Sequence, residues 1–459
     1  MTARVAQADS VAFEAAADVV VVGAGAAGLV AALSAAERGA SVAVLEGDRL
    51  PRGSTALSAG LIPAAGTRFQ RRKGIEDTPE RFAADIMAKA RGAADPAVLA
   101  AVTAAIGPAL EWLADRHGLP FDVVTDFRYP GHSAHRMHAL PSRSGAELMD
   151  RLLAAAERAQ IAVLTEARVT TLFAEPGGRV RGVAAARPGG EEGIGAGAVV
   201  LASSGYGGNR DLVRRHIPGL AEALWFGHSG NTGDALVWGE ALGAAVAHLP
   251  GHQGHGSVAH PHGILITWAV ITEGGFQVNT KGERFSNETE GYSEQAERVL
   301  AQPGSVAWDV FDARIAAVAR QFEDFRAAEA VGAVLTAPTL ASLAALMRVP
   351  AEALEAEAAA ARGRDRFGRD WSSTRPLAPP FHAVRVTGAL FHTQGGLVVG
   401  PDARVRRQDG SALPNLFAAG GAAAGLSGPE ASGYLSGNGL LTAVALGRIA
   451  GIAAAERGR

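Results

Sequence analysis

The apolar positions of the first fifty residues change from a continuous run to a helical spacing and back. DVVVV (18–22) is β-branched and continuous, which predicts a buried strand. LVAALSAAERGA (29–40) has apolar residues at helical spacing and reaches Gly39, a residue typical of a helix C-terminus. SVAVLE (41–46) is a second strand-like run. The pattern predicts a βαβ unit with the turn GAGAAG (23–28) inside it.

The rest of the chain divides into two regions that differ in residue composition and in predicted secondary structure. Helical patterns cover residues 78–92, 96–118 and 144–160, and strand-like runs cover 161–175, 179–187 and 198–205. A glycine- and histidine-rich stretch begins near residue 251, alanine-rich helices follow to about 362, and strands return at 388. We predict an α/β chain with a split Rossmann-like nucleotide-binding domain (1–250 and 376–459) and an inserted α+β capping domain (251–375).

Composition narrows the class of protein. The 459 residues exceed what one core usually supports, which agrees with two domains. Net charge is -3, so a nucleic-acid partner is not expected. The chain has no cysteine, which excludes disulfides, thiolate nucleophiles and iron–sulfur clusters. We find no signal peptide and no apolar run of about 18 residues, and therefore expect a cytoplasmic protein without a membrane span.

The turn after the first strand has the spacing Gly23-x-Gly25-x-x-Gly28. The first glycine permits the tight turn, the second lets a pyrophosphate approach the backbone at Ala26, and the third lets helix and strand pack closely. Glu46 ends the second strand, where a carboxylate can accept hydrogen bonds from ribose hydroxyls. Strand, turn, helix and acid together predict a bound dinucleotide.

A second region favours FAD over NAD. NLFAAGG (415–421) lies near the C-terminus and precedes the apolar helical pattern of residues 440–456. The N-terminus of that helix can be directed at the isoalloxazine, where its dipole stabilises the negative charge of a reduced flavin. We therefore predict FAD as the cofactor.

Several motifs together resemble the fumarate reductase / succinate dehydrogenase flavoprotein superfamily, which includes soluble fumarate reductases and 3-ketosteroid Δ1-dehydrogenases. They are DVVVVGAGAAGLVAALSAAERGASVAVLE, STALSAG, AVVLASSGYGGN, VNTKGERFSNE, FHTQGGLVV, NLFAAGGAAAG and GNGLLTAVALGRIAG. The resemblance covers residues 18–452. It implies hydride transfer between FAD and a carbon–carbon bond next to an activating group.

Two positions depart from the superfamily's cofactor site. Covalent members carry histidine where this chain has Ser54, so the resemblance implies noncovalent FAD. An acidic residue often follows the glycine of the second FAD motif, and here that residue is Gly421. The expected cofactor-binding residues are Gly23, Gly25, Ala26, Gly28, Glu46, Ser54, Thr55, Ala59, Gly60, Val169, Gly205, Gly420, Gly421, Ser436, Gly437 and Asn438.

The active-site motifs depart further. Two arginines of fumarate reductases, a proton donor and a carboxylate clamp, match Tyr292 and Tyr434 here, and the acid and arginine of the proton relay match Trp268 and Ile271. This pattern is similar to that of the ketosteroid dehydrogenases, whose site uses tyrosines as base, as support for the base and as ligand of the ketone oxygen. The third role requires a tyrosine in the C-terminal loop.

Desaturating a ketone requires a polarised carbonyl, a base for the α-proton and an acceptor for the β-hydride. Tyr434 with a backbone N–H of its glycine-rich loop suits the first role and Tyr292 the second, with Tyr129 assisting because a free tyrosine titrates near ~10. His392 either binds a second substrate oxygen or holds its loop near the flavin. Each tyrosine has a purely structural alternative: packing for Tyr434, a surface position for Tyr292 and a loop aromatic for Tyr129.

Two polar clusters remain. The histidines between 248 and 262 have irregular spacing without alternating carboxylates, so we expect no metal. Arg136 and Arg143 are the candidates for binding a substrate carboxylate, because arginine pairs with it bidentately. Trp225, Trp268 and Phe276 are candidates to line a ring-binding cap.

Three functions compete. The leading one is an FAD-dependent desaturase of a cyclic ketone, either a steroid or a smaller oxo-cyclohexane compound, passing electrons to oxygen, a quinone or a carrier protein. The second is a fumarate-reductase-like reductase of an unsaturated carboxylate, which the missing arginines oppose. The third is a flavoprotein electron carrier without turnover of its own. Convergence of the tyrosines on the flavin would discriminate the first from the third.

Overall fold

The computed structural model describes residues 3–9 and 11–458 and divides into two compact units. Unit 1 comprises Met1–Ile217, Gly227–His252 and His392–Arg459, and unit 2 comprises Pro218–Phe226 and Gln253–Phe391. Unit 2 ends beyond residue 375, where the sequence analysis placed the end of the insertion. The reason is that β18 (Phe381–Thr393) is a central strand of the unit 2 sheet.

Five parallel strands form the centre of unit 1 in the order β7-β3-β2-β10-β21. They are β2 (Ala15–Val22), β3 (Val42–Leu45), β7 (Ala162–Leu164), β10 (Gly190–Leu201) and β21 (Ala412–Ala418). Helix α1 (Ala26–Glu37) connects β2 to β3, which confirms the predicted βαβ unit. Val19 to Val22 are all buried, as expected for a parallel strand covered on both faces.

Strand β10 joins two parts of this sheet. Its first half pairs antiparallel with β9 (Val180–Arg187), and its last three residues pair parallel with β21. Strand β9 pairs with β8 (Arg168–Ala174), which pairs with β1 (Arg4–Gln7). The strand-like runs expected over 161–175 and 179–187 therefore contribute strands that extend the nucleotide-binding sheet.

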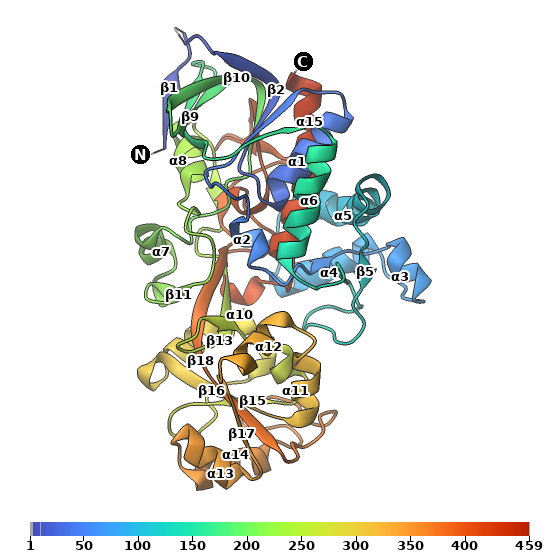
Figure 1. Cartoon of the computed structure of the whole chain (residues 1–459), viewed down its shortest axis with the longest axis vertical. Coiled ribbons are helices and arrows are strands. Elements are labelled where there is room, and N and C mark those ends of the chain that lie inside the picture. Colours follow the sequence, from blue (N-terminus) through green and yellow to red (C-terminus); the bar gives the residue numbers. More distant parts are fainter. Residues whose placement is uncertain (1–2, 10, 459) are drawn as a thin grey trace. The chain divides into compact units, whose positions relative to one another are not determined.

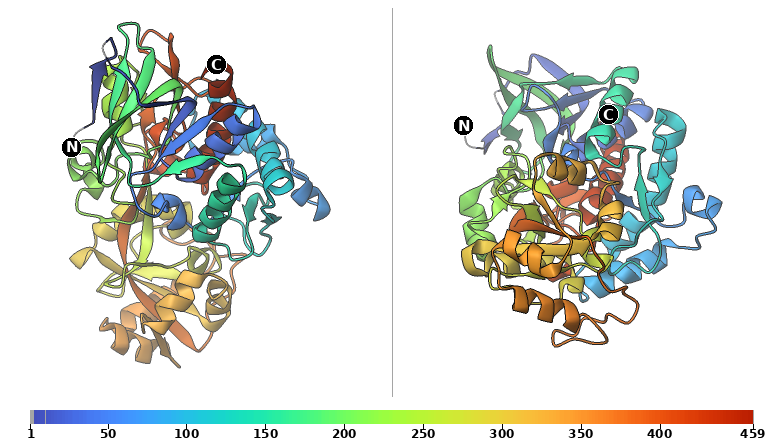
Figure 2. Two further views of the ribbon diagram at one scale, coloured as in Figure 1. Left: turned by 45° about the horizontal axis from the view of Figure 1, so that its top comes forward. Right: turned by 60° about the horizontal axis from the view of Figure 1, so that its bottom comes forward.

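Helix α15 (Asn438–Gly458) returns the end of the chain to α1, and the two lie side by side (Figures 1 and 2). A Cβ at Gly447 would lie 2.6 Å from the Ala27 oxygen, and one at Gly451 would lie 2.2 Å from the Ala31 oxygen. Only glycine therefore permits this close helix contact.

The other helices of unit 1 are α2 (Gly53–Ala56), α3 (Arg68–Arg72), α4 (Pro79–Lys89), α5 (Pro96–His117), α6 (Gly145–Arg158), α7 (Arg210–His216) and α8 (Asp234–Ala241). Its short strands are β4 (Ile62–Pro63), β5 (Asp122–Val123), β6 (Met137–Ala139), β12 (Val246–Ala247), β19 (Gly396–Leu397) and β20 (Arg404–Arg406).

By length and composition alone, α5 and α15 could cross a membrane. More than half of the most apolar window of each is buried inside the fold, as in the core helices of globular domains. Their apolar character is accounted for by packing in unit 1, where α15 contacts both α1 and α5.

Unit 2 is built on a seven-stranded sheet with the order β14-β13-β18-β16-β15, to which β11 and β17 add by pairing with β18. The strands are β11 (Leu224–Trp225), β13 (His252–Ala259), β14 (Ile264–Leu265), β15 (Phe276–Val278), β16 (Val306–Asp312), β17 (Val334–Ala337) and β18. The helices are α9 (Ala269–Thr272), α10 (Tyr292–Leu300), α11 (Ala313–Ala319), α12 (Glu323–Ala330), α13 (Leu340–Met347) and α14 (Ala351–Ala360). The chain passes between the units on either side of Pro218–Phe226, and again within β13 and within β18.

Candidate active site

The glycine-rich turn after β2 has the geometry of a dinucleotide cradle. Gly23 has φ +102°, and a Cβ at Gly28 would lie 1.8 Å from the Gly23 oxygen, so neither position accepts a side chain. At Gly25 a Cβ would meet only the Thr55 hydroxyl, at 3.6 Å, which leaves this side of the turn open. The Ala26 N–H at the start of α1 donates to that hydroxyl at 3.2 Å. A pyrophosphate fits the open side, next to the helix N-terminus.

Glu46 and Ser203 border the same turn. The Glu46 carboxylate accepts the N–H groups of Ala24 (2.8 Å) and Asp48 (3.0 Å), which fixes it at the end of β3. The Ser203 Cα would lie 3.2 Å from a Cβ at Gly23, and the buried Ser203 hydroxyl has no hydrogen-bond partner among the residues that the structure describes. A ligand with polar groups would satisfy that hydroxyl, so these residues fit a bound dinucleotide.

Ser54 holds a loop of unit 1. Its hydroxyl accepts the His228 N–H at 3.0 Å and the Asn231 side-chain amide at 2.8 Å. The His228 ring pairs in turn with Asp48, at 2.6 Å between Nε2 and Oδ2. The segment around Ser54 is thereby tied to the end of β3. Noncovalent attachment of the cofactor stays a prediction at this position.

The other expected cofactor positions are mainly sites of close backbone approach. A Cβ at Gly60 would meet the Ser144 oxygen at 2.6 Å, and one at Gly205 would meet the Thr393 hydroxyl at 2.0 Å. Ala59 precedes Gly60, Val169 is buried on β8, Gly420 and Gly437 have positive φ, and the Ser436 oxygen accepts from His132 at 3.0 Å. All of these residues lie in unit 1.

Gly421 stands where the superfamily often has an acidic residue, and steric crowding explains the glycine. A Cβ there would lie 2.8 Å from the Gly205 nitrogen and 3.0 Å from His392 Nε2. Any side chain at this position would therefore displace the imidazole. Glycine at 421 and histidine at 392 are compatible as a pair.

Tyr434 lies at the N-terminus of α15. The side chain is buried, and its hydroxyl oxygen accepts the Gly439 N–H at 3.4 Å. Tyr129 is close enough to Tyr434 to interact electrostatically, and burial together with this neighbour raises the Tyr129 pKa. A phenol with a raised pKa stays protonated, so Tyr129 suits a hydrogen-bonding role rather than that of a base.

His392 is connected to α15 through side chains. The Gln394 amide nitrogen lies 2.8 Å from His392 Nδ1, and the Gln394 oxygen accepts from the Ser427 hydroxyl at 2.9 Å. The Asn438 amide donates to that hydroxyl at 3.1 Å. Burial lowers the His392 pKa to about 4, so the ring is neutral near pH 7. The sequence analysis gave no role to Gln394, which lies inside the quoted motif FHTQGGLVV, or to Ser427, which lies outside every quoted motif.

Tyr292 belongs to unit 2, where it starts α10. It is buried, not on the surface, which removes one alternative. His255 stacks on its ring at 4.8 Å between centroids, and Trp268 meets it edge-on at 6.2 Å. Burial lowers the His255 pKa to about 3, and its Nδ1 accepts the Ser257 N–H at 3.1 Å. The Trp268 Nε1 is buried without a hydrogen-bond partner among the described residues.

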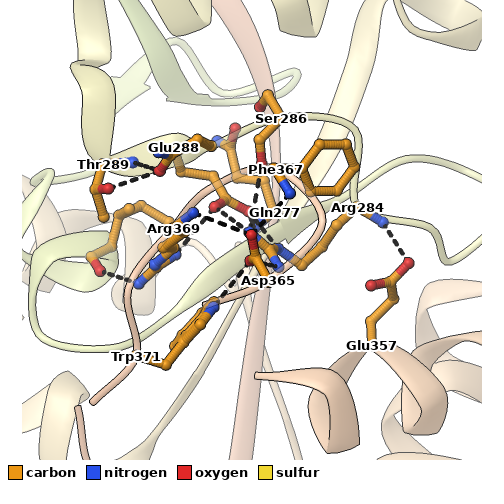
Figure 3. A network of polar contacts seen from close by, with 12 residues as sticks. Gln277, Arg284, Ser286, Glu288, Thr289, Glu357, Asp365, Phe367, Arg369 and Trp371 are labelled. Atoms are coloured by element: carbon orange, nitrogen blue, oxygen red, sulfur yellow. Dashed lines mark hydrogen bonds and ion pairs between the residues drawn. The ribbon is translucent and has the colours of Figure 1, made fainter. Parts of the chain in front are cut away.

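Unit 2 also explains the RFSNE motif (284–288). Arg284 and Arg369 both pair with the buried Glu288, at 2.8 and 3.0 Å, and Arg284 pairs with Asp365 at 2.5 Å (Figure 3). Such a group is destabilised strongly when one partner is removed. The motif therefore holds unit 2 together. Phe276 packs in the core of this unit, which corrects its assignment to a ring-binding cap, whereas Trp225 is half-buried on β11.

The candidate carboxylate-binding arginines already have acidic partners. The buried Arg136 pairs with Asp77 at 2.6 Å and, through a shorter contact, with Asp85. Arg143 pairs with Asp126 at 2.5 Å. Arg136 therefore serves the structure of unit 1, and the expectation that it binds substrate is wrong. Within residues 3–9 and 11–458, no three His, Asp or Glu side chains are grouped as metal ligands.

Comparison with known proteins gives the family. Residues 18–440 match the FAD binding domain family. The chain is 30% identical over 452 residues to the NADH:fumarate oxidoreductase of Klebsiella pneumoniae, covering 96% of this chain but only 48% of that protein. It is 30% identical to the probable fumarate reductase Ifc3 of Shewanella frigidimarina, covering 95% and 74%.

Two further relatives match over nearly their full length. The 4-oxocyclohexanecarboxylate 2-dehydrogenase of Sinomonas cyclohexanicum is 29% identical, with 92% of each chain covered. The crystal structure of 3-ketosteroid-Δ4-(5α)-dehydrogenase from Rhodococcus jostii RHA1 superposes with a TM-score of 0.77 at 27% identity, covering 99% of this chain and 100% of that chain. The chain thus belongs to the fumarate reductase family of FAD-binding flavoproteins and is an FAD-dependent oxidoreductase.

Proposed function

We propose that the chain is a dehydrogenase that introduces a carbon–carbon double bond next to the carbonyl of a cyclic ketone. The observation that carries this proposal is Tyr434, a buried phenol whose oxygen accepts an N–H from the start of α15. With its oxygen accepting from the helix, the O–H acts as a donor, and a ketone oxygen is a matching acceptor. A donor held before the reaction stabilises the negative charge that develops on that oxygen.

Each role falls to a different residue. Tyr434 polarises the carbonyl, which acidifies the α C–H bonds. Tyr292 takes the α-proton. The sequence analysis assigned Tyr129 to assist Tyr292, and we propose instead that it supports Tyr434, with which it interacts electrostatically. FAD, when bound, accepts the β-hydride, so that the ketone is oxidised to the enone and the flavin is reduced by two electrons. The two electrons then pass to an acceptor, which is oxygen, a quinone or a carrier protein.

Two relatives support a cyclic substrate. A 4-oxocyclohexanecarboxylate dehydrogenase and a ketosteroid dehydrogenase both match this chain over at least nine-tenths of their length. Arg136 is committed to two aspartates, so the substrate carboxylate of the former has no partner at this position. We therefore favour a neutral ring ketone.

Reduction of an unsaturated carboxylate is the second candidate, because relatives named fumarate reductases match at 30% identity. The positions matching their two active-site arginines are Tyr292 and Tyr434, which cannot pair with a carboxylate as arginine does.

An anaerobic titration separates the two. The flavin-loaded protein is mixed with cyclohexanone, with 4-oxocyclohexanecarboxylate and with a saturated 3-ketosteroid, and flavin bleaching is followed together with formation of the enone. Bleaching by a ketone supports the dehydrogenase. If every ketone leaves the flavin oxidised while fumarate reoxidises the dithionite-reduced protein, the reductase is correct and the role given to Tyr434 is wrong.

A further inference from the structure

The polarity of the hydrogen bonds behind His392 carries one further inference. The Gln394 amide nitrogen, which can only donate, lies 2.8 Å from His392 Nδ1. Nδ1 must therefore be the acceptor, and in a neutral imidazole the single ring proton then resides on Nε2. The tautomer of His392 thus depends on which end of the Gln394 amide faces the ring.

The orientation of that amide is set by two further side chains. The Gln394 oxygen accepts from the Ser427 hydroxyl at 2.9 Å, and this hydroxyl accepts the Asn438 amide at 3.1 Å. A Cβ at Gly425 would lie 2.6 Å from the Gln394 oxygen, so glycine there leaves room for this orientation. Asn438, Ser427 and Gln394 consequently each donate in the direction of His392.

Asn438 determines that direction. It is the first residue of α15, it is fully buried, and its Oδ1 has no hydrogen-bond partner among residues 3–9 and 11–458. An unsatisfied carbonyl oxygen at an expected cofactor position suits a hydrogen-bond donor of the bound flavin. With Oδ1 directed there, the amide nitrogen is left to face Ser427.

Nε2 of His392 faces Gly421, and the ring carbons Cδ2 and Cγ face Gly439. Nε2 lies 3.0 Å from the position of a Cβ at Gly421, and the ring lies 4.0 Å from that of a Cβ at Gly439. The Tyr434 hydroxyl lies 3.8 Å from the same Gly439 position. The imidazole, through its carbon atoms, and the phenol, through its hydroxyl, therefore border one glycine at the start of α15.

We propose that Gln394, Ser427 and Asn438 are positioning residues that hold His392 in the Nε2–H tautomer, so that the imidazole donates a hydrogen bond to an oxygen of the substrate. The last clause rests on the proposed function, whereas the tautomer does not. A fixed donor selects an acceptor, such as a ketone or ether oxygen, and disfavours a substrate that presents a donor there. The need for a donor to His392 Nδ1 also explains why the chain carries an amide at position 394.

The tautomer can be measured directly. The flavin-loaded protein is prepared with ¹⁵N-labelled histidine, and the His392 signals are identified by their loss in His392→Asn. We expect a protonated Nε2 and an unprotonated Nδ1. In Gln394→Glu the carboxylate accepts rather than donates, so Nδ1 should become protonated. Gln160→Glu, the same charge change at an exposed position of unit 1, should leave the His392 signals unchanged.

Activity is the second readout. Gln394→Glu should lower kcat/KM for the ketone about tenfold or more, because a satisfied buried donor is replaced by a mismatched group. An Nδ1–H tautomer in the wild-type protein, or an unchanged tautomer in Gln394→Glu, overturns the proposal. If the glutamate variant does not fold, Ser427→Ala replaces it, and we then expect a mixture of both His392 tautomers. A pure Nε2–H signal in Ser427→Ala would count against the proposed hydrogen-bond network. If the tautomer is as expected but no ketone reduces the flavin, the proposed function fails and the positioning network stands.

Discussion

Replacing Tyr434 with phenylalanine tests the central assignment most directly. The substitution removes one oxygen atom and leaves a buried aromatic ring in place. That oxygen accepts the Gly439 N–H over a long 3.4 Å contact. A hydrogen bond contributes roughly 0.5–1.5 kcal/mol net, and this one should lie at the low end. Helix α15 keeps its packing against α1, so the fold and the flavin should be retained.

The catalytic effect should be far larger than the structural one. If the hydroxyl stabilises the enolate oxygen in a water-excluded site, its loss should slow flavin reduction by about 10²–10³-fold, as for removal of one oxyanion donor. That corresponds to ~3–4 kcal/mol of transition-state stabilisation. The rate of anaerobic flavin bleaching at saturating ketone, followed by stopped flow, measures this step without the unknown electron acceptor.

Tyr206→Phe is the matched control. Tyr206 is also a buried tyrosine of unit 1, and its hydroxyl donates to the Leu249 oxygen. The same atom is removed there, and we expect a loss of thermal stability with the rate of flavin reduction unchanged. If Tyr434→Phe bleaches its flavin at the wild-type rate while both proteins bind FAD, Tyr434 is a packing residue and the carbonyl is polarised elsewhere.

Two further substitutions test the cradle and the core of unit 2. Gly28→Ala should abolish FAD binding, because the new Cβ would lie 1.8 Å from the Gly23 oxygen. The flavin content of the purified protein measures this effect. A variant with a full complement of flavin would contradict the close approach of α1 to β2. Asp309 is buried and its pKa is raised, mainly by burial, to about 7 from an ordinary 3.8. The native state therefore binds the extra proton between these values, so this group should reduce the stability of the fold by up to ~4 kcal/mol as pH rises from 4 to 7. Asp309→Asn, which keeps hydrogen bonds to Ser257 and Gln277 possible, should flatten that slope in urea unfolding curves, and an unchanged slope would mean that Asp309 is ionised in the fold.

The local part of the fold could be predicted because its determinants lie next to each other in the sequence. The turn between β2 and α1 depends on glycine spacing within six residues, and the structure confirms the strand, turn and helix. Helix α15 starts at Asn438, two residues before the expected start at 440, because the Leu441 N–H already donates to the Gly437 oxygen at 2.9 Å. Such ends depend on contacts that apolar spacing does not encode.

The long-range pairs could not be predicted. Arg136 looked available for a substrate because its partners, Asp77 and Asp85, lie more than fifty residues earlier in the sequence. Likewise, His255 appeared as one of several histidines in a glycine-rich stretch, and only the fold of unit 2 places it on Tyr292. Residues with no motif of their own acquire their role from packing, which a single sequence does not reveal.

The surroundings of Tyr292 bear on whether proton removal in the proposed reaction depends on the base or on polarisation of the ketone. His255, which burial keeps neutral, stacks on the Tyr292 ring, and Trp268 meets it edge-on, so neither of these two rings carries a positive charge. A free tyrosine titrates near ~10, and a phenol is a weak base for an unactivated C–H bond. Under the proposed function, proton removal then depends on how strongly the ketone oxygen is polarised, which is the role that we propose for Tyr434. It follows that Tyr434→Phe should slow breaking of the α C–H bond as well as hydride transfer, and that an α-deuterated ketone should show a larger isotope effect in this variant than in the wild-type protein.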